Sequence, residues 1–222
     1  MDLNIKDICF LLNANERYVM SLIDKRDIPF YKMHHHYRFN KGEISEWILR
    51  RGSFLNDAFF KLQKIDNPLS VVEHIKNGGI YYNIEGNDIA SVIRNSVELL
   101  PLSANINRET LLSYLLEREE MMPTYIGSGI AVPHPKKPII SETEKQFIAV
   151  CFLKDEFVYR DKNNEKLHTL FVIISSNQSN HLKTLSLISY VLHNRRFVEI
   201  LKERASKDEI YFEMEKALME KL

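Results

Sequence analysis

The sequence has 222 residues, of which 45% are hydrophobic and 27% are charged, as in an ordinary water-soluble globular protein. This length is enough for one large or two small domains, each with its own core. The 30 basic residues balance the 30 acidic residues, which excludes a protein whose whole surface binds nucleic acid.

The start of the chain and its two cysteines indicate the compartment. The segment "MDLNIKD" lacks the basic flank and the apolar stretch of a signal peptide, and no apolar run is long enough to span a bilayer. We therefore expect an unprocessed cytoplasmic protein. Cys9 and Cys151 lie far apart within apolar segments, and we expect both to be reduced core residues.

Two short helices are predicted near the start of the chain. In "IKDICFLL" the isoleucines and the last leucine fall on one helical face. Asn13 tolerates a left-handed backbone, and Asn15 is a natural N-cap for the next helix, "ERYVMSLIDK". Two helices with so tight a connection indicate a helix-turn-helix.

A hairpin and a third helix are predicted to complete this region. In "IPFYKMHHHYRFN", apolar residues alternate on both sides of a four-residue polar tip, which predicts a β-hairpin. The helix "KGEISEWILR" then returns Ile44, Trp47 and Ile48 to the small core. Residues 1–52 hold nine basic and seven acidic residues, so their net charge is 9 − 7 = +2, which permits nucleic-acid binding without requiring it.

Residues 1–52 resemble the excisionase-type branch of the helix-turn-helix proteins, a relative of the MerR winged modules. The matching positions are Leu3, Lys6, Leu12, Ile23, Ile28, Pro29, Lys32, Tyr37, Arg38, Phe39 and Trp47. The resemblance implies DNA contacts from the start of the second helix, which enters the major groove, and from the hairpin. The candidate residues are Arg17, Tyr18, Ser21, Lys32, His35 and Arg38. The alternative for the helix residues is a plain solvated face.

The three adjacent histidines, His34 to His36, are assigned to the tip of the hairpin rather than to a metal site, because they cannot all face one ion. We predict no metal and no cofactor. Residues 53–78 are predicted to form a helical connector, with "FLNDAFFKLQKI" and "LSVVEHIKN" as its two helices.

From residue 79 onward, strands and helices alternate. The segments "GGIYYNIEG", "FIAVCFL" and "LHTLFVIIS" are predicted strands. The predicted helices are "DIASVIRNSVELL", "NRETLLSYLLEREE", "NHLKTLSLISYVLHN", "FVEILKERAS" and "DEIYFEMEKALME". We therefore expect an α/β protein, in which a small winged helix-turn-helix domain precedes a mixed-sheet α/β domain at 79–222 that is flanked by helices.

The stretch "GSGIAVPHPKK" carries the chemistry. Gly127 and Gly129 permit a sharp turn and a close approach to a ligand. Pro133 and Pro135 restrict the backbone around His134 and hold its imidazole in one place. A largely neutral, rigidly held imidazole is a good nucleophile for a phosphoryl group. The alternative is a surface turn whose histidine has no role.

Two more residues favour the reactive interpretation. Arg118 can supply a fixed positive fork for phosphate oxygens, although alone it is typical of a solvated helix end. His181 is predicted to open a helix that is capped by Ser179 or Asn180, so its imidazole would lie at the positive helix end, where anions are favoured. A structural capping role is the alternative.

The segments "LLEREEMMPTYIGSGIAVPH" and "SNHLKTLSLIS" resemble the type-2 enzyme IIA domain of the bacterial phosphotransferase system, which includes fructose, mannitol and nitrogen-regulatory members. The resemblance implies that His134 accepts a phosphoryl group from the phosphocarrier protein HPr or a relative. It implies that His181 and Arg118 complete the catalytic site, and we assign Gly127, Gly129 and Thr124 to phosphate binding. Met121 and Met122 stand near the implied docking surface.

Our leading hypothesis is a regulatory protein that couples phosphorylation of His134 to DNA binding, through charge that repositions the IIA domain. A homodimer is expected, because a single DNA-binding module of this size binds weakly. One alternative is an enzyme IIA relay that passes the group to a permease component and uses the N-terminal module for protein contacts. Another is a DNA-binding protein whose IIA domain is a phosphate-insensitive scaffold.

Overall fold

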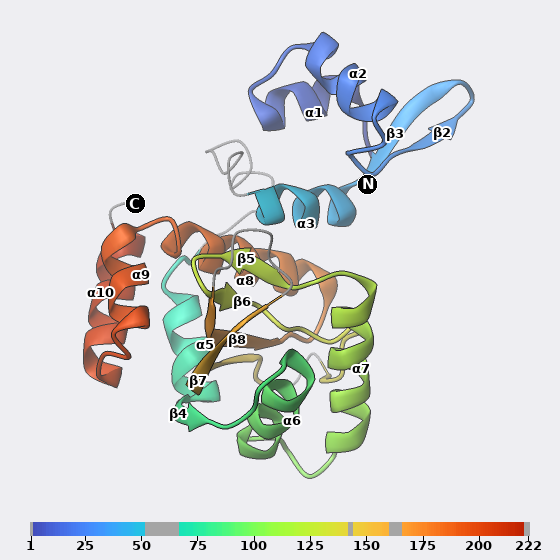
Figure 1. Ribbon diagram of the computed structural model, residues 1–222. Helices are drawn as coiled ribbons and strands as arrows, with labels where there is room; N and C mark the ends of the chain where they lie inside the picture. Colours follow the sequence, from blue (N-terminus) through green and yellow to red (C-terminus); the bar gives the residue numbers. More distant parts are fainter. Residues whose placement is uncertain (1, 52–66, 142–143, 160–165, 220–222) are drawn as a thin grey trace. The chain divides into compact units, whose positions relative to one another are not determined.

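The computed structural model describes residues 2–51, 67–141, 144–159 and 166–219. The chain divides into two compact units between Asp66 and Asn67 (Figure 1). The helix Ser70–Gly78, which we predicted within the connector, belongs to the second unit. The other predicted connector helix, "FLNDAFFKLQKI", lies outside the described residues. The domain limits 1–52, 53–78 and 79–222 stay predictions.

The first unit begins with the predicted pair of helices, α1 (Ile5–Leu12) and α2 (Glu16–Asp24). Asn13 ends α1 in the left-handed conformation, with φ 48° and ψ 48°. Asn15 caps α2, because its side chain accepts a hydrogen bond from the backbone N–H of Tyr18 at 2.9 Å. The local roles predicted for both asparagines are confirmed.

The hairpin of the first unit closes more tightly than predicted. Its strands are β2 (Tyr31–Met33) and β3 (His36–Asn40), and β1 (Asp2–Leu3) pairs with the other edge of β3. Met33 pairs directly with His36, so the tip is a two-residue turn and the predicted four-residue tip is wrong. His34 and His35 have φ of 47° and 65°, as the two central residues of a turn that follows the strand twist require.

The third helix, α3 (Lys41–Arg51), closes the small core with the two isoleucines that the sequence predicted, whereas Trp47 is only half-buried. Ile44 and Ile48 are fully buried, together with Phe39 of the hairpin. The indole N–H of Trp47 donates to the backbone oxygen of Asp27, which ties the helix to the segment before the hairpin.

The second unit is built on a mixed five-stranded sheet of order β4-β7-β8-β6-β5. The central antiparallel pair β7–β8 is flanked by the parallel neighbours β4 and β6, and β5 forms an antiparallel hairpin with β6. The strands are β4 (Ile80–Ile84), β5 (Tyr125–Gly127), β6 (Ile130–Ala131), β7 (Phe147–Val158) and β8 (Lys166–Ile174). The short strands β5 and β6 were not predicted.

Helices cover this sheet on both faces, because β8 is buried at successive positions and cannot leave either side in water. Leu170, Val172 and Ile174 pack into one core with α6 and α7, while Phe171 and Ile173 between them are equally buried. The helices are α5 (Ser70–Gly78), α6 (Ile89–Leu99), α7 (Arg108–Met121), α8 (Gln178–Val191), α9 (Arg195–Lys202) and α10 (Lys207–Met219). The predicted fold class is confirmed.

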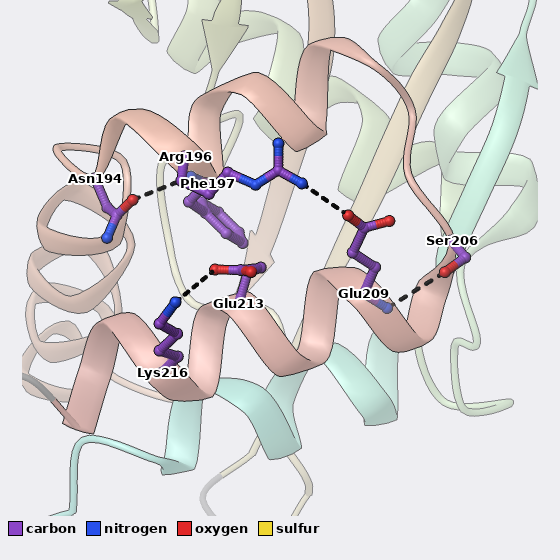
Figure 2. A network of polar contacts seen from close by, with 7 residues as sticks. All are labelled: Asn194, Arg196, Phe197, Ser206, Glu209, Glu213 and Lys216. Atoms are coloured by element: carbon purple, nitrogen blue, oxygen red, sulfur yellow. Dashed lines mark hydrogen bonds and ion pairs between the residues drawn. The ribbon is translucent and has the colours of Figure 1, made fainter.

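The last two helices form an antiparallel pair with capped starts, shown in Figure 2. Asn194 caps α9 through the N–H of Phe197 at 3.2 Å, and Ser206 caps α10 through the N–H of Glu209 at 3.3 Å. An ion pair of 3.1 Å between Arg196 and Glu209 joins the two helices. None of the described helices combines the length and the apolar character that a membrane crossing requires.

Candidate functional site

His134 lies just beyond the carboxyl end of β6, in the second unit. The chain continues alongside β8 there, because the N–H of Ile173 donates to the oxygen of Pro133 at 2.9 Å. The imidazole is only 6% exposed. The imidazole is therefore buried just beyond the end of a sheet strand, and its rigid presentation by the two flanking prolines stays a prediction.

Both nitrogens of the His134 ring have defined partners. Nδ1 lies 2.9 Å from the backbone oxygen of Val132, and Nε2 lies 3.0 Å from Nε of Arg118. A carbonyl oxygen can only accept and a guanidinium N–H can only donate. The contacts therefore agree on one neutral tautomer, with the proton on Nδ1 and the lone pair on Nε2.

Arg118 reaches this ring from the last turn of α7. Another of its guanidinium nitrogens donates to the backbone oxygen of Met122, the C-cap of this helix, at 2.8 Å. The arginine is 8% exposed, so its charge lies in a poorly solvated position where it acts strongly on neighbouring groups. The structure brings Arg118 and His134 together, as the sequence analysis expected.

His181 completes the cluster. Its ring centroid lies 4.4 Å from that of His134, with 46° between the ring planes. Burial, and then the charge of Arg118, lower the pKa of His181 to about 4, so the ring is neutral near pH 7. Its Nε2 is buried without a hydrogen-bond partner among the described residues, and such an atom in a native structure calls for an explanation, of which a catalytic role is one.

The predicted cap of the His181 helix is wrong. Asn177 is the N-cap, and its side chain accepts from the N–H of Asn180 at 2.9 Å. The N–H of His181 itself donates to the oxygen of Asn177 at 3.0 Å. The helix therefore begins earlier than the predicted caps Ser179 and Asn180, and His181 acts at the site through its ring rather than through a free backbone amide.

The glycine turn lies at the opposite end of β6 from His134. Gly127, Ser128 and Gly129 have φ of 102°, 53° and 74°. Gly127 ends β5 and pairs with Ile130, and Ser128 and Gly129 connect β5 to β6. The extended strand separates this turn from the imidazole, so the structure does not bring Gly127 and Gly129 together with His134. Their assignment to phosphate binding stays a prediction.

His168, on β8, holds the glycine turn, and no pattern in the sequence indicated it. Its Nε2 lies 3.0 Å from the oxygen of Ser128, and its Nδ1 lies 2.8 Å from the hydroxyl of Thr169. A Cβ built on Gly129 would lie 2.3 Å from the His168 ring. Gly129 is thus required for close packing, whereas a Cβ on Gly127 would meet nothing within 4 Å and only its φ favours glycine.

Thr124 is buried at the start of the β5 segment. Its hydroxyl and its N–H both donate to the carboxylate of Glu119. The threonine therefore has an interior partner, and its role in phosphate binding stays a prediction. Met121 and Met122, at the end of α7 close to Arg118, are 77% and 40% exposed.

The candidate DNA-binding residues lie in the first unit, on α2 and on the hairpin. On α2, Arg17 and Tyr18 are exposed in the first turn, and the hydroxyl of Ser21 donates to the oxygen of Tyr18 at 2.7 Å. This internal bond occupies the proton of the Ser21 hydroxyl but leaves its oxygen as an acceptor.

The hairpin residues present a positive surface of modest size. Lys32 and His35 are exposed, and Arg38 is half-buried in β3. The ammonium of Lys32 lies 4.9 Å from the centroid of the Tyr37 ring, a cation–π contact that orients this charge. DNA binding by the six candidate residues stays a prediction.

The arrangement around His134 suits transfer of an anionic group. The electron pair of His134 Nε2 accepts a hydrogen bond from a guanidinium. The imidazole of His181 beside it has a buried Nε2 with no hydrogen-bond partner among the described residues. A phosphoryl group bound to Nε2 would meet donors that neutralise its oxygens.

The helix-turn-helix domain family matches residues 3–52, and the family described as "Phosphoenolpyruvate-dependent sugar phosphotransferase system, EIIA 2" matches residues 73–217. The fructose-specific EIIABC component of that system in Bacillus subtilis (strain 168) is 30% identical over 145 residues, which are 64% of this chain and 22% of that protein. The chain thus spans a small part of the length of this relative. The nitrogen regulatory protein of Escherichia coli (strain K12) is 27% identical over 116 residues, which are 51% of this chain and 70% of that protein.

Solved structures share the fold of the second unit. The nitrogen regulatory protein IIA-Ntr from Neisseria meningitidis has a TM-score of 0.54 at 16% identity, and the match covers 66% of this chain and 97% of that one. The mannitol IIA of Escherichia coli has a TM-score of 0.52 at 21% identity, with 61% and 94% covered. The family match at residues 73–217 covers well over half of this chain. The chain therefore belongs to the EIIA 2 family of the phosphoenolpyruvate-dependent sugar phosphotransferase system.

Proposed function

We propose that His134 accepts a phosphoryl group at Nε2 from a phosphohistidine carrier of the HPr type. The observation that carries this proposal is the contact of 3.0 Å between Nε2 of His134 and the guanidinium of Arg118, with the His181 ring beside it. A buried cation next to a neutral nucleophile favours an anionic reactant and stabilises the charge of the transferred group.

In the transfer step the P–N bond of the donor breaks and a P–Nε2 bond to His134 forms. The proton on Nδ1 stays in place, and its hydrogen bond to Val132 stabilises the positive charge that develops on the ring. Arg118 gives up its contact with Nε2, because phosphorus takes the lone pair, and donates to the phosphoryl oxygens instead. Nε2 of His181, which has no hydrogen-bond partner among the described residues, becomes a second donor to these oxygens when it carries a proton.

The phosphoryl group changes the electrostatics of His181. Its pKa of about 4 belongs to a site that holds only the charge of Arg118. A phosphoryl group adds up to about two negative charges, which favour the protonated imidazole and raise its pKa. His181 therefore binds the phosphoryl group more strongly as the transfer proceeds.

The labelling reaction tests this step directly. Radioactive phosphoenolpyruvate with enzyme I and HPr is expected to label the wild type and to leave His134→Ala unlabelled. The label is expected to be acid-labile and base-stable, as a phosphoramidate of histidine is. An unlabelled wild type, with a known IIA protein labelled in the same tube, would reject the proposal.

We propose further that the phosphorylation state controls DNA binding by the first unit. The support is the presence of a helix-turn-helix domain at residues 3–52 of the same chain as the acceptor site. A homodimer would place two recognition helices on one DNA site and compensate for the weak binding of one module.

Selection of bound sequences from random DNA, followed by titration of phosphorylated and unphosphorylated protein at several salt concentrations, tests the coupling. Equal affinity of the two forms at every salt concentration would reject it.

A relay function is the second candidate. The mannitol IIA of Escherichia coli, which shares the fold, has been solved in complex with phosphorylated enzyme IIB. If this chain acts likewise, His134 passes its phosphoryl group to a IIB component. Transfer of label from the purified phosphorylated chain to isolated IIB proteins would support the relay, and retention of the label would favour the regulatory role.

A further inference from the structure

Glu119 is a buried carboxylate in the last turn of α7, one residue after Arg118, and it is 4% exposed. Its two oxygens accept from the N–H of Thr124 at 3.1 and 3.2 Å. They also accept from the hydroxyls of Thr124 and Tyr159. Each of these partners donates, which suits an ionised carboxylate because it has acceptor sites only.

The hydrogen bonds continue from Thr124 to the reactive ring. The oxygen of Thr124 accepts from the N–H of Val132 at 3.0 Å. The oxygen of Val132 in turn accepts from Nδ1 of His134 at 2.9 Å. The backbones of two residues, Thr124 and Val132, therefore connect the carboxylate of Glu119 to the proton-bearing nitrogen of the imidazole.

Hydrogen bonds thus connect consecutive residues of α7 to both nitrogens of His134. Arg118 contacts Nε2 directly, and Glu119 is connected to Nδ1 through Thr124 and Val132. We propose that Glu119 is a positioning residue, which fixes the Val132 carbonyl so that His134 keeps its proton on Nδ1 and its lone pair on Nε2. This inference rests on the proposed function, in which the lone pair of Nε2 is the nucleophile.

The tautomer matters because a ring with its proton on Nε2 has no lone pair there for phosphorus. It would also place an N–H against the N–H of Arg118. A carbonyl that shifts away from Nδ1 weakens the preference for the reactive tautomer, so the reactive fraction falls. Loss of the group that sets a histidine tautomer is costly in other enzymes for the same reason.

A purely structural role for Glu119 makes a different prediction. In that case the carboxylate only ties the end of α7 to β5, and its loss lowers stability without changing the ring. The protonation of the two ring nitrogens separates these roles. Nitrogen-15 NMR of the full chain reports it, and the His134 signals are assigned by their absence from His134→Ala.

The variants are Glu119→Gln, Thr124→Val and Glu120→Gln. The first keeps the shape of the side chain but replaces one acceptor by a donor. The second removes the hydroxyl that donates to Glu119. The third makes the same change at the neighbouring, exposed glutamate of α7 and is the matched control.

In the wild type we expect Nδ1 protonated and Nε2 unprotonated. In Glu119→Gln we expect a substantial population with protonated Nε2 and a fall of about tenfold in the rate of labelling by the phosphorylated carrier, the lower end of the effect known for groups that orient metal-binding histidines. Thr124→Val is expected to change both quantities in the same direction by less. Glu120→Gln is expected to match the wild type.

Ring spectra of Glu119→Gln and Thr124→Val that match the control would overturn the inference, and so would slower labelling with an unchanged tautomer. If Glu119→Gln does not fold, Thr124→Val decides alone. Failure of the wild type to take up label would reject the proposed function, while the NMR result would still decide whether Glu119 sets the tautomer.

Discussion

Two buried histidines lie at opposite ends of the short strand β6, and they differ in what their nitrogens face. His134 and His168 are 6% and 4% exposed, so burial does not distinguish them. His168 donates from Nε2 to a carbonyl, and its Nδ1 lone pair is occupied by the hydroxyl of Thr169. His134 carries the opposite tautomer, with its Nε2 lone pair directed at Arg118.

Under the proposed function, this difference explains why one buried imidazole accepts a phosphoryl group and the other does not. Neutral partners satisfy both nitrogens of His168, and burial lowers its pKa, which leaves a neutral packing residue against the glycine turn. At His134 the lone pair faces a cationic side chain that can move onto an incoming group. The His181 ring beside it has a nitrogen without a partner among the described residues.

The first prediction compares substitutions of these two histidines, and it includes the largest expected effect. His134→Ala is expected to lower labelling by at least about a thousandfold, because the nucleophile is gone. His168→Gln, whose amide can still donate to Ser128, is expected to keep the label and to lose about 1–2 kcal/mol of unfolding free energy. Labelling and urea unfolding measure the two quantities. A folded His168→Gln protein that takes up no label would show that phosphorylation also requires His168, contrary to the contrast drawn between the two histidines.

The second prediction concerns the cation, and the same helix offers a matched control. Arg118→Lys keeps the charge but loses the planar fork, so the labelling rate is expected to fall roughly a hundredfold. Arg108 begins α7 and donates to the backbone oxygens of Val97 and Leu100, away from the site. Arg108→Lys is expected to lower stability and to leave the rate unchanged. Equal rates for the two variants would remove Arg118 from the transfer step.

The sequence predicts the parts of this site that depend on local pattern. The left-handed Asn13, the cap Asn15 and the alternation of strands and helices follow from a few neighbouring residues each. The grouping of His134 with Arg118 and His181 follows from the motif resemblance, and the structure brings these residues together.

Other features depend on the sheet order and could not be predicted. The hairpin β5–β6 places the glycine turn and His134 at opposite ends of one strand, although they are neighbours in sequence. His168 contacts Ser128, and Tyr159 contacts Glu119, and each pair is separated by 40 residues in the sequence. These contacts depend on how the strands pair in the sheet. The start of α8 was misplaced because several consecutive polar residues can cap a helix equally well.

The third prediction tests the packing of the glycine turn against His168. Gly129→Ala places a Cβ 2.3 Å from the ring of His168 and keeps a φ of 74°, so a loss of about 4 kcal/mol is expected. Gly127→Ala has open space around the Cβ and is expected to cost only about 1 kcal/mol, for its φ of 102°. Urea unfolding of both variants measures the difference, and equal losses would show that packing on His168 is unimportant.

The fourth prediction uses the pH dependence of stability at the His134 end. The pKa of His181 is about 4 in the folded chain and near 6.5 when unfolded. Between these values the unfolded chain binds a proton that the folded chain does not, so this contribution is complete above pH 6.5 and is lost as the pH falls toward 4. The loss amounts to about 3 kcal/mol.

His181→Gln removes this contribution, so its unfolding free energy is expected to fall less between pH 7 and pH 4.5 than that of the wild type. Urea unfolding at both pH values gives the comparison. Because His168 titrates in both proteins, its own effect cancels. Parallel pH profiles for the two proteins would show that the imidazole of His181 is not held neutral by the site.

The smallest expected effect concerns another pair of histidines, which are exposed. His34 and His35 form the tip of the hairpin with φ of 47° and 65°, a conformation that strains a side chain with a Cβ. The double substitution His34→Asn with His35→Gly supplies the asparagine–glycine pair that this turn prefers, so the first unit is expected to gain about 1 kcal/mol. Hydrogen exchange of the amides in β2 and β3 measures the gain. Labelling of His134 is expected to stay unchanged. Faster exchange in the variant would mean that the two exposed imidazoles stabilise the hairpin through their own contacts. Exposure would then not predict the role of these histidines, just as burial does not distinguish the roles of His134 and His168.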